Sequence, residues 1–392
     1  MSAGAVHGRD EGAGLPSRIG INAVFLEPRM GGLETYVRDL LPQLVRLAPR
    51  TRFSVFCSPG GREYLRGEDW ATEVELIAHP LVGRRGLKAL TELTLLGSIA
   101  GRRVDLLHSV AMTAPLRTRA VNVVTLADII WLVAPDPGEA ATTRLWRAIV
   151  PPVARRADRV ITLSHASAED IVERLGVPRE RIDVVALAAG GSDRVDPTPK
   201  QELRARLELG DGPVVLTVAA KKVHKNLPRL VRAMRVVVEQ WPSAVLVMPG
   251  NSTPHEQELR TLATELSLEG NVVFPPYVSS ADLEGLYSLA SCFVFPSLHE
   301  GFGIPILEAM RRGVPVACSR ASALPEVAGE GARYFDPDDV SDIAAAIREL
   351  LGDPVLAARL SAAGREREAR FTWEQTARGT LASYERAWAA RG

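Results

Sequence analysis

The chain has 392 residues, of which 46% are hydrophobic and 24% are charged, with 47 lysines and arginines against 47 aspartates and glutamates. This length suits two domains, each with its own core, and the balanced charge gives no overall positive field that would recruit nucleic acid. No stretch of about 18 apolar residues is free of charge, so the sequence predicts no transmembrane helix, and any membrane contact would be peripheral.

Residues 1–17 are rich in Gly, Ala and charged residues and lack an apolar segment long enough for a signal peptide. We therefore expect a flexible tail. The cysteines at positions 57, 292 and 318 lie far apart in the sequence, and the first two lie in apolar runs. This spacing predicts reduced thiols and no metal site. We therefore expect a cytoplasmic protein, which could lie peripherally at the inner membrane face.

Short apolar, β-branched runs alternate with segments of helical period along the whole chain, which predicts an α/β fold with parallel sheets. In the first half we expect strands at 18–25, 53–57, 104–108, 121–126, 159–163 and 182–185. In the second half we expect them at 214–218, 244–248, 272–274, 292–295, 314–317 and 333–335.

A turn-rich polar stretch with Gly-Gly and two prolines separates the halves and is predicted to be a linker over 189–200. The domains would then span 18–188 and 201–370. A last helical pattern at 371–388 carries an aromatic stripe, which by itself indicates core packing.

Two Gly-containing loops follow predicted strands. Gly31 and Gly32 come after the first strand and open a helix, so their amides could approach a phosphate or an acceptor. The second loop, Glu300–Gly303, precedes a helix with Pro305 near its start, and this arrangement aims the positive end of the helix at the loop. An anionic group such as a phosphate is the ligand expected there.

Glu300 and Glu308 are separated by seven residues, so one lies in the loop and the other about one turn into the helix. A carboxylate accepts hydrogen bonds from a pair of sugar hydroxyls. This pattern suggests Glu308 for a ribose and Glu300 for a transferred sugar. Gly-x-Gly alone would indicate no more than a tight turn, but here both glutamates, both glycines and the proline follow one buried strand.

The segment HEGFGIPILEAMRRGVPV resembles the signature of glycosyltransferase family 4, whose members are retaining enzymes of GT-B architecture. The segments MGGLETYVRDL, VHKNLPRLVRAM and SALPEVAGEGARYFDPDD agree with it. The resemblance implies two Rossmann-like domains facing across a cleft, with the nucleotide sugar held mainly by the C-terminal domain and the acceptor by the N-terminal one. It also implies that the final helix, at 371–388, crosses back to the N-terminal domain.

Carried over to this sequence, the family pattern implies that Glu308 holds the ribose. Glu300 and the backbone of Gly301, Phe302, Gly303 and Ile304 would contact the donor sugar and phosphates. Lys225 would face the diphosphate, and a cation there would stabilise the charge of the departing nucleotide without a metal.

Two segments depart from the family pattern. Ala127 stands where a histidine usually precedes Asp128, and alanine cannot donate a hydrogen bond to the sugar. His108, at the end of a neighbouring strand, could supply an imidazole or simply be a packed residue. In VAAKKVHKNL, Ala219 and His224 replace a glycine and an arginine, and Lys221 or Lys222 could compensate by reaching the same phosphates.

The sequence therefore predicts a glycosyltransferase with Glu300, Lys225 and Asp128 as catalytic residues and no cofactor beyond its nucleotide-sugar substrate. The donor expected first is GDP-mannose, followed by UDP-glucose or UDP-N-acetylglucosamine. The acceptor is left open among lipid-linked glycans, polysaccharide ends and small metabolites, and the oligomeric state is not predicted. The alternatives are a sugar-nucleotide hydrolase or phosphorylase, and a sugar-nucleotide-binding protein with weak catalysis.

A basic-ended helical stretch at 81–103 lies in the acceptor-side domain. Its leucines would pack against the sheet, as most such helices do. Alternatively, its arginines and lysine would approach anionic lipid headgroups.

Overall fold

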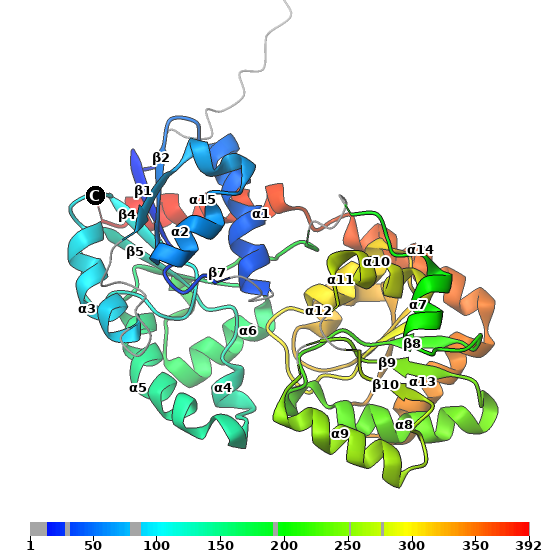
Figure 1. The fold of residues 1–392 in the computed structure, drawn as a ribbon. Helices are drawn as coiled ribbons and strands as arrows, with labels where there is room; N and C mark the ends of the chain where they lie inside the picture. Colours follow the sequence, from blue (N-terminus) through cyan, green and yellow to red (C-terminus); the bar gives the residue numbers. More distant parts are fainter. Residues whose placement is uncertain are drawn as a thin grey trace, which may run out of the picture.

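The computed structural model describes residues 14–27, 32–78, 88–190, 195–250, 252–275 and 278–391. It contains two parallel sheets with helices packed on them, one sheet from each half of the chain (Figure 1). The α/β fold class predicted from the alternation of strands and helices is confirmed.

The first sheet has the strand order β3-β2-β1-β4-β5-β6-β7 within the described residues. Its strands are buried on both faces, as helix-covered parallel strands are, and for this reason their apolar runs were detectable in the sequence. The exception is β3, a half-buried edge strand that the sequence analysis missed. The strands are β1 (Arg18–Asn22), β2 (Arg52–Cys57), β3 (Glu75–Ala78), β4 (Leu106–Ser109), β5 (Val121–Thr125), β6 (Arg159–Thr162) and β7 (Ile182–Val184).

The longest helices of this half are amphipathic. In α1 the buried residues recur three and four positions apart, so one stripe of the helix faces the sheet. The helices are α1 (Gly32–Leu47), α2 (Pro59–Leu65), α3 (Lys88–Ala100), α4 (Ile130–Val133), α5 (Ala140–Arg156) and α6 (His165–Asp170). Part of the basic-ended stretch at 81–103 forms α3, and its residues 81–87 lie outside the described part of the chain, as do residues 1–13 of the expected tail.

The second sheet has the order β10-β9-β8-β11-β12-β13 in the described chain. Its strands are β8 (Val214–Leu216), β9 (Val245–Val247), β10 (Val272–Val273), β11 (Ala290–Phe295), β12 (Val316–Ser319) and β13 (Ala332–Phe335). The helices are α7 (Lys200–Arg206), α8 (Leu227–Gln240), α9 (Pro254–Glu265), α10 (Ser280–Leu289), α11 (Ile304–Arg311), α12 (Leu324–Ala328), α13 (Val340–Gly352) and α14 (Pro354–Glu368).

The last helix, α15 (Trp373–Ala389), follows the second sheet in sequence but packs on α1, β5 and β6 of the first half (Figure 1). A buried series of hydrogen bonds fixes α15 in this position. The Tyr384 hydroxyl lies 2.7 Å from His108 Nδ1, and His108 Nε2 lies 2.7 Å from Thr125 Oγ1. His108 is therefore a packed residue with both ring nitrogens engaged, and the imidazole does not face the cleft as a ligand.

This histidine predicts an acid-dependent stability. Burial lowers the pKa of His108 from its ordinary value of 6.5 to about 3. Between these values the unfolded chain binds a proton that the folded chain does not, so stability falls as the pH falls from about 6.5 towards 3. We expect His108→Gln, which has no titrating group, to show a smaller decrease in urea-unfolding free energy between pH 7 and pH 4. Equal decreases in the two proteins would contradict this assignment.

None of the helices within the described ranges is long and apolar enough to cross a bilayer. The cysteines at positions 57, 292 and 318 are buried and form no disulfide.

Candidate active site

The predicted site residues lie in loops that follow the carboxyl ends of parallel strands. Lys221–Lys225 follow β8, Glu300–Gly303 follow β11, and Asp128 lies three residues after β5. In the second sheet β8 and β11 are neighbours although they are far apart in sequence, and their following helices diverge there. Ligands of open α/β sheets bind at this kind of strand-order reversal.

Three of the predicted residues are brought together from both halves of the chain. The Lys225 ammonium lies 2.5 Å from Glu300 Oε1, and both side chains are largely buried. Burial raises the pKa of the Asp128 carboxyl. Asp128 also lies close enough to Glu300 and Lys225 for their charges to act on it: Glu300 raises its pKa further and Lys225 lowers it. We call Asp128, Lys225 and Glu300 the central cluster. It brings one cation and one carboxylate of the second half close to a carboxylate of the first half.

Gly301 lets the halves meet at this cluster. A Cβ at Gly301 would lie 2.5 Å from the Ala127 carbonyl oxygen and 2.8 Å from Asp128 Cβ, closer than real Cβ contacts. The Gly301 carbonyl also accepts a hydrogen bond from Ser167 Oγ at 3.3 Å. Glycine at this position is thus required by the close approach of the loop to the other half.

The rest of the loop leads into the N-terminal end of α11. Gly303 has φ of 112°, a conformation that favours glycine, and it is the N-cap residue immediately before α11. No side chain caps this end. Pro305 has no amide hydrogen and the Ile306 amide donates to the Gly303 carbonyl at 3.0 Å, so the backbone amides that can face a ligand here are those of Gly303 and Ile304. Phe302 is buried and packs edge-on against Phe371, with ring centroids 5.8 Å apart. Its side chain anchors the loop, and only its backbone could meet a ligand.

Glu308 lies in α11 and points toward the domain junction. Its Oε2 accepts a hydrogen bond from the Tyr287 hydroxyl at 3.0 Å, while Oε1 lies 3.5 Å from the position that a Cβ of Gly190 would take. Burial raises the pKa of Glu308, and the charge of Arg312 opposes this effect. The carboxylate is therefore partly buried among polar and charged side chains at the domain junction.

The N-terminal glycine loop is only partly described. Gly31 lies outside the described residues. Gly32 begins α1, and a Cβ there would lie 3.7 Å from Ile304 Cδ1. The starts of α1 and α11 therefore lie next to each other across the cleft.

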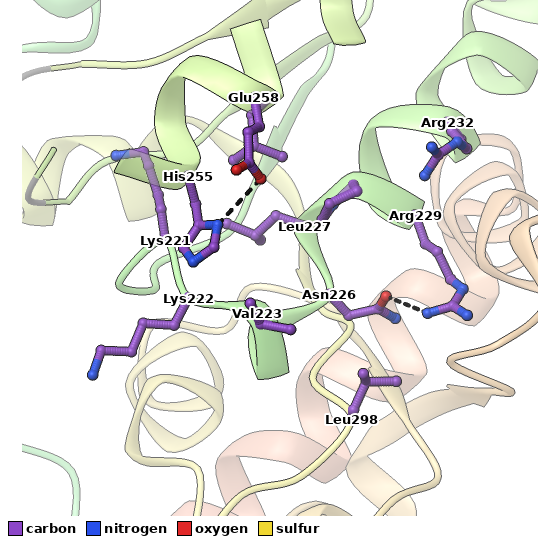
Figure 2. Close-up of a pocket in the computed structure, with 12 residues that line it drawn as sticks. Lys221, Lys222, Val223, Asn226, Leu227, Arg229, Arg232, His255, Glu258 and Leu298 are labelled. Atoms are coloured by element: carbon purple, nitrogen blue, oxygen red, sulfur yellow. Dashed lines mark hydrogen bonds and ion pairs between the residues drawn. The ribbon is translucent and has the colours of Figure 1, made fainter. Parts of the chain in front are cut away.

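Lys221 and Lys222 do not join the central cluster. The buried ammonium of Lys221 pairs with Glu256 Oε2 at 3.3 Å and donates to the Gly250 carbonyl at 3.1 Å. Lys222 pairs with Glu139 Oε1 at 2.8 Å. Both lysines line a basic pocket of about 420 Å³ at the starts of α8 and α9, together with Arg229, Arg232, His255 and Glu258. Figure 2 shows these side chains.

His224 adds no positive charge to the site near neutral pH. It is buried, and burial together with the charge of Lys225 lowers its pKa to about 4. Its carbonyl accepts a hydrogen bond from the Leu298 amide at 2.8 Å. His224 thus joins the loop after β8 to the loop after β11.

The two halves are also joined by ion pairs on either side of the central cluster. His299 Nε2 lies 3.0 Å from Asp170 Oδ2, and His255 Nε2 lies 3.1 Å from Asp136 Oδ2. The pair between Lys222 and Glu139 adds a third contact between the halves.

Sequence reasoning missed several residues that shape this site. Tyr287 lies outside the recognised motifs. Arg311 lies inside the signature but was given no role, and it donates to the carbonyls of Gly190 and Ala189 at 3.1 and 3.4 Å, respectively. No local pattern reveals such long-range contacts. His299, in contrast, lies inside the signature beside Glu300 and could have been noticed there.

Comparison with known families decides the classification. The model described as "Glycosyltransferase Family 4" matches residues 30–187, and the model described as "Glycosyl transferases group 1" matches residues 199–367. The chain belongs to glycosyltransferase family 4. This confirms the family predicted from the signature segments.

The relatives of this family 4 chain include several mannosyltransferases. It is 32% identical to the O-antigen chain mannosyltransferase B of Escherichia coli, over 58% of this chain and 61% of that protein. It is 27% identical to the GDP-mannose-dependent alpha-(1-6)-phosphatidylinositol monomannoside mannosyltransferase of Mycolicibacterium smegmatis, over 90% of this chain and 94% of that protein. The match spans less than two thirds of the first of these proteins and 28–29% of some longer relatives.

The fold of the family 4 chain is shared with solved structures. Anabaena HepE in complex with UDP-glucose superposes with a TM-score of 0.71 at 21% identity, covering 93% of this chain and 98% of that one. The GT-B architecture expected from the family resemblance is therefore confirmed.

Proposed function

We propose that this protein is a retaining hexosyltransferase that moves a sugar from a nucleotide-diphosphate donor to a glycan, lipid-linked or small-molecule acceptor. The observation that carries the proposal is the central cluster, in which Lys225 and Glu300 meet Asp128 of the other domain beside the start of α11. A nucleotide-sugar donor is also supported by HepE, which was solved with UDP-glucose.

In the proposed arrangement the donor lies along the cleft. Glu308 accepts hydrogen bonds from the ribose hydroxyls, the amides at the start of α11 face the diphosphate, and Glu300 contacts the sugar. The acceptor hydroxyl attacks the anomeric carbon from the face that the diphosphate leaves. The bond between that carbon and the phosphate oxygen breaks, and the departing phosphate takes the acceptor's proton. Lys225 stabilises the charge that develops on the diphosphate.

Lys225 and the amide end of α11 supply positive charge from the protein itself, so we expect catalysis without a divalent metal. Sugar transfer should keep its full rate after treatment with EDTA and gel filtration. Loss of the activity with EDTA and its return with magnesium or manganese would contradict metal-independent transfer.

GDP-mannose is the donor we propose first, because several relatives are named as mannosyltransferases and one is named as GDP-mannose-dependent. A thermal-shift comparison of GDP, UDP and their sugars tests this choice. A larger rise in melting temperature with GDP than with UDP would support it, and the reverse order would favour a UDP-sugar.

Leu96 of α3 is buried, and Leu95 and Ile99 pack beside it against the first half, as the sequence predicted. The alternative of a lipid-linked acceptor at a membrane surface therefore rests on the start of the helix alone. Leu90 is 58% exposed there, and basic residues flank the helix in the sequence. We expect the protein to float with anionic vesicles at low salt and to be released at high salt, because each lysine or arginine near the surface contributes about 1 kcal/mol. Absence from the anionic vesicle fraction at low salt would favour a soluble acceptor.

A sugar-nucleotide-binding protein with weak turnover is the second candidate, and Ala127 at the family's histidine position favours it. It would bind the donor without releasing nucleotide when acceptors are supplied. A hydrolase or phosphorylase would release nucleotide with water or phosphate alone.

A further inference from the structure

The two carboxylate oxygens of Glu308 have different surroundings. Oε2 accepts the hydrogen bond from the Tyr287 hydroxyl at 3.0 Å, and Tyr287 is only 1% exposed. Oε1 lies toward Gly190 at the domain junction, where Thr35 of α1 also comes close. Among the described residues, none donates a hydrogen bond to Oε1. One oxygen is thus held by the protein while the other faces the cleft.

Tyr287 is itself held in one position. The centroid of its ring lies 6.0 Å from that of Phe293 of β11. The Arg312 guanidinium lies over the Tyr287 ring, 4.6 Å from the ring centroid. Arg312 pairs with Glu284 through Nε at 2.6 Å and donates to the Glu308 carbonyl at 2.7 Å. The guanidinium charge is therefore compensated by Glu284, and the phenol remains the side-chain donor to Glu308.

The charges around Glu308 explain why this donor matters. Burial raises the pKa of the Glu308 carboxyl, and Glu284 raises it further. Arg312, the hydrogen bond from Tyr287 and Arg311 act in the opposite direction. Burial also raises the pKa of Tyr287 well above 10, so the hydroxyl keeps its proton and donates throughout the neutral range.

We propose that Tyr287 is a positioning residue for nucleotide binding, which fixes one oxygen of Glu308 so that the other accepts hydrogen bonds from the ribose. This inference rests on the ribose role of Glu308 given under the proposed function. Tyr287 does not touch the nucleotide and acts through the carboxylate. It therefore affects the affinity of any nucleotide that Glu308 holds.

The test is titration calorimetry with GDP and UDP on the full chain. Tyr287→Phe removes the hydroxyl but keeps the ring and its contacts with Phe293 and Arg312, so folding should be preserved. We expect it to raise the nucleotide Kd about three- to tenfold. Tyr334→Phe is the matched control, because its hydroxyl donates to the Gly329 carbonyl and not to Glu308. The control should leave the Kd unchanged.

Two further measurements separate positioning from a general structural effect. In a Glu308→Gln background, Tyr287→Phe should add no further loss of affinity. In the Tyr287→Phe protein, the fall in affinity on acidification should move to higher pH than in the wild type, because a carboxyl that has lost a donor is protonated more easily. A general packing defect would produce neither result.

The outcomes distinguish this inference from the proposed function. If Glu308→Gln weakens nucleotide binding while Tyr287→Phe leaves both the Kd and its pH profile unchanged, the positioning role is wrong and the ribose role stands. If Glu308→Gln itself leaves the Kd unchanged, the ribose role is wrong, and the positioning role falls with it.

Discussion

Lys225→Ala is expected to lower the rate of sugar transfer by on the order of 100-fold, the size of effect seen when a group that stabilises transition-state charge is removed. The Lys225 ammonium is 2.5 Å from Glu300 and 5.2 Å from the centre of the Phe295 ring, so it is held in a partly buried place where charge interacts strongly. Because the diphosphate gains charge as it departs, the nucleotide-sugar Kd should change much less than the turnover number.

The matched control is Lys222→Ala, three positions earlier in the same loop. The Lys222 ammonium pairs with Glu139 and lies 40% exposed, outside the central cluster. We expect its turnover number to stay within about threefold of the wild type. If the two lysine variants lost turnover equally, or if Lys225→Ala lost affinity and turnover in the same proportion, Lys225 would not act selectively on the leaving group.

Gly301→Ala is expected to reduce sugar transfer by on the order of 100-fold, because it displaces the loop that carries Glu300 from the domain that carries Asp128. Its new Cβ would lie 2.5 Å from the Ala127 carbonyl oxygen, a backbone atom that cannot turn aside as a flexible side chain would. The halves must then separate at the central cluster.

Gly270→Ala provides the control for this substitution, because a Cβ at Gly270 meets no atom within 4 Å. We expect wild-type turnover from it. Small-angle scattering should show a larger radius of gyration for Gly301→Ala than for Gly270→Ala. Wild-type activity in Gly301→Ala would mean that the close contact of the halves is not needed for transfer.

The strands could be predicted because their apolar residues are contiguous in sequence, as in Val121–Thr125 and Val214–Leu216, which are buried between helices on both sides. Glu75–Ala78 could not, because an edge strand needs less apolar surface and its residues are half-exposed. The apolar pattern of the buried strands was therefore enough to predict the fold class. It was not enough to predict the edge strand.

The site shows a similar division. Lys225, Glu300 and Glu308 were identifiable from local motifs, since each belongs to a loop or helix start with a recognisable residue pattern. The pairing of Lys221 with Glu256, the hydrogen bond from Tyr287 to Glu308 and the contacts of Arg311 with the linker depend on how distant segments pack. A single sequence carries no local signal for such contacts. Because Lys221 pairs with Glu256, its contact with the phosphates stays a prediction.

We propose that the cleft transfers a sugar from a nucleotide-diphosphate donor. The most direct test of this proposal is the release of nucleotide from GDP-mannose, UDP-glucose and UDP-N-acetylglucosamine, measured with and without a mixture of glycan and lipid-linked acceptors. We predict that one donor releases nucleotide only when an acceptor is present, with the sugar recovered on that acceptor and the rate lost in Lys225→Ala. Release that is equally fast in water alone, or unchanged in Lys225→Ala, would contradict the account.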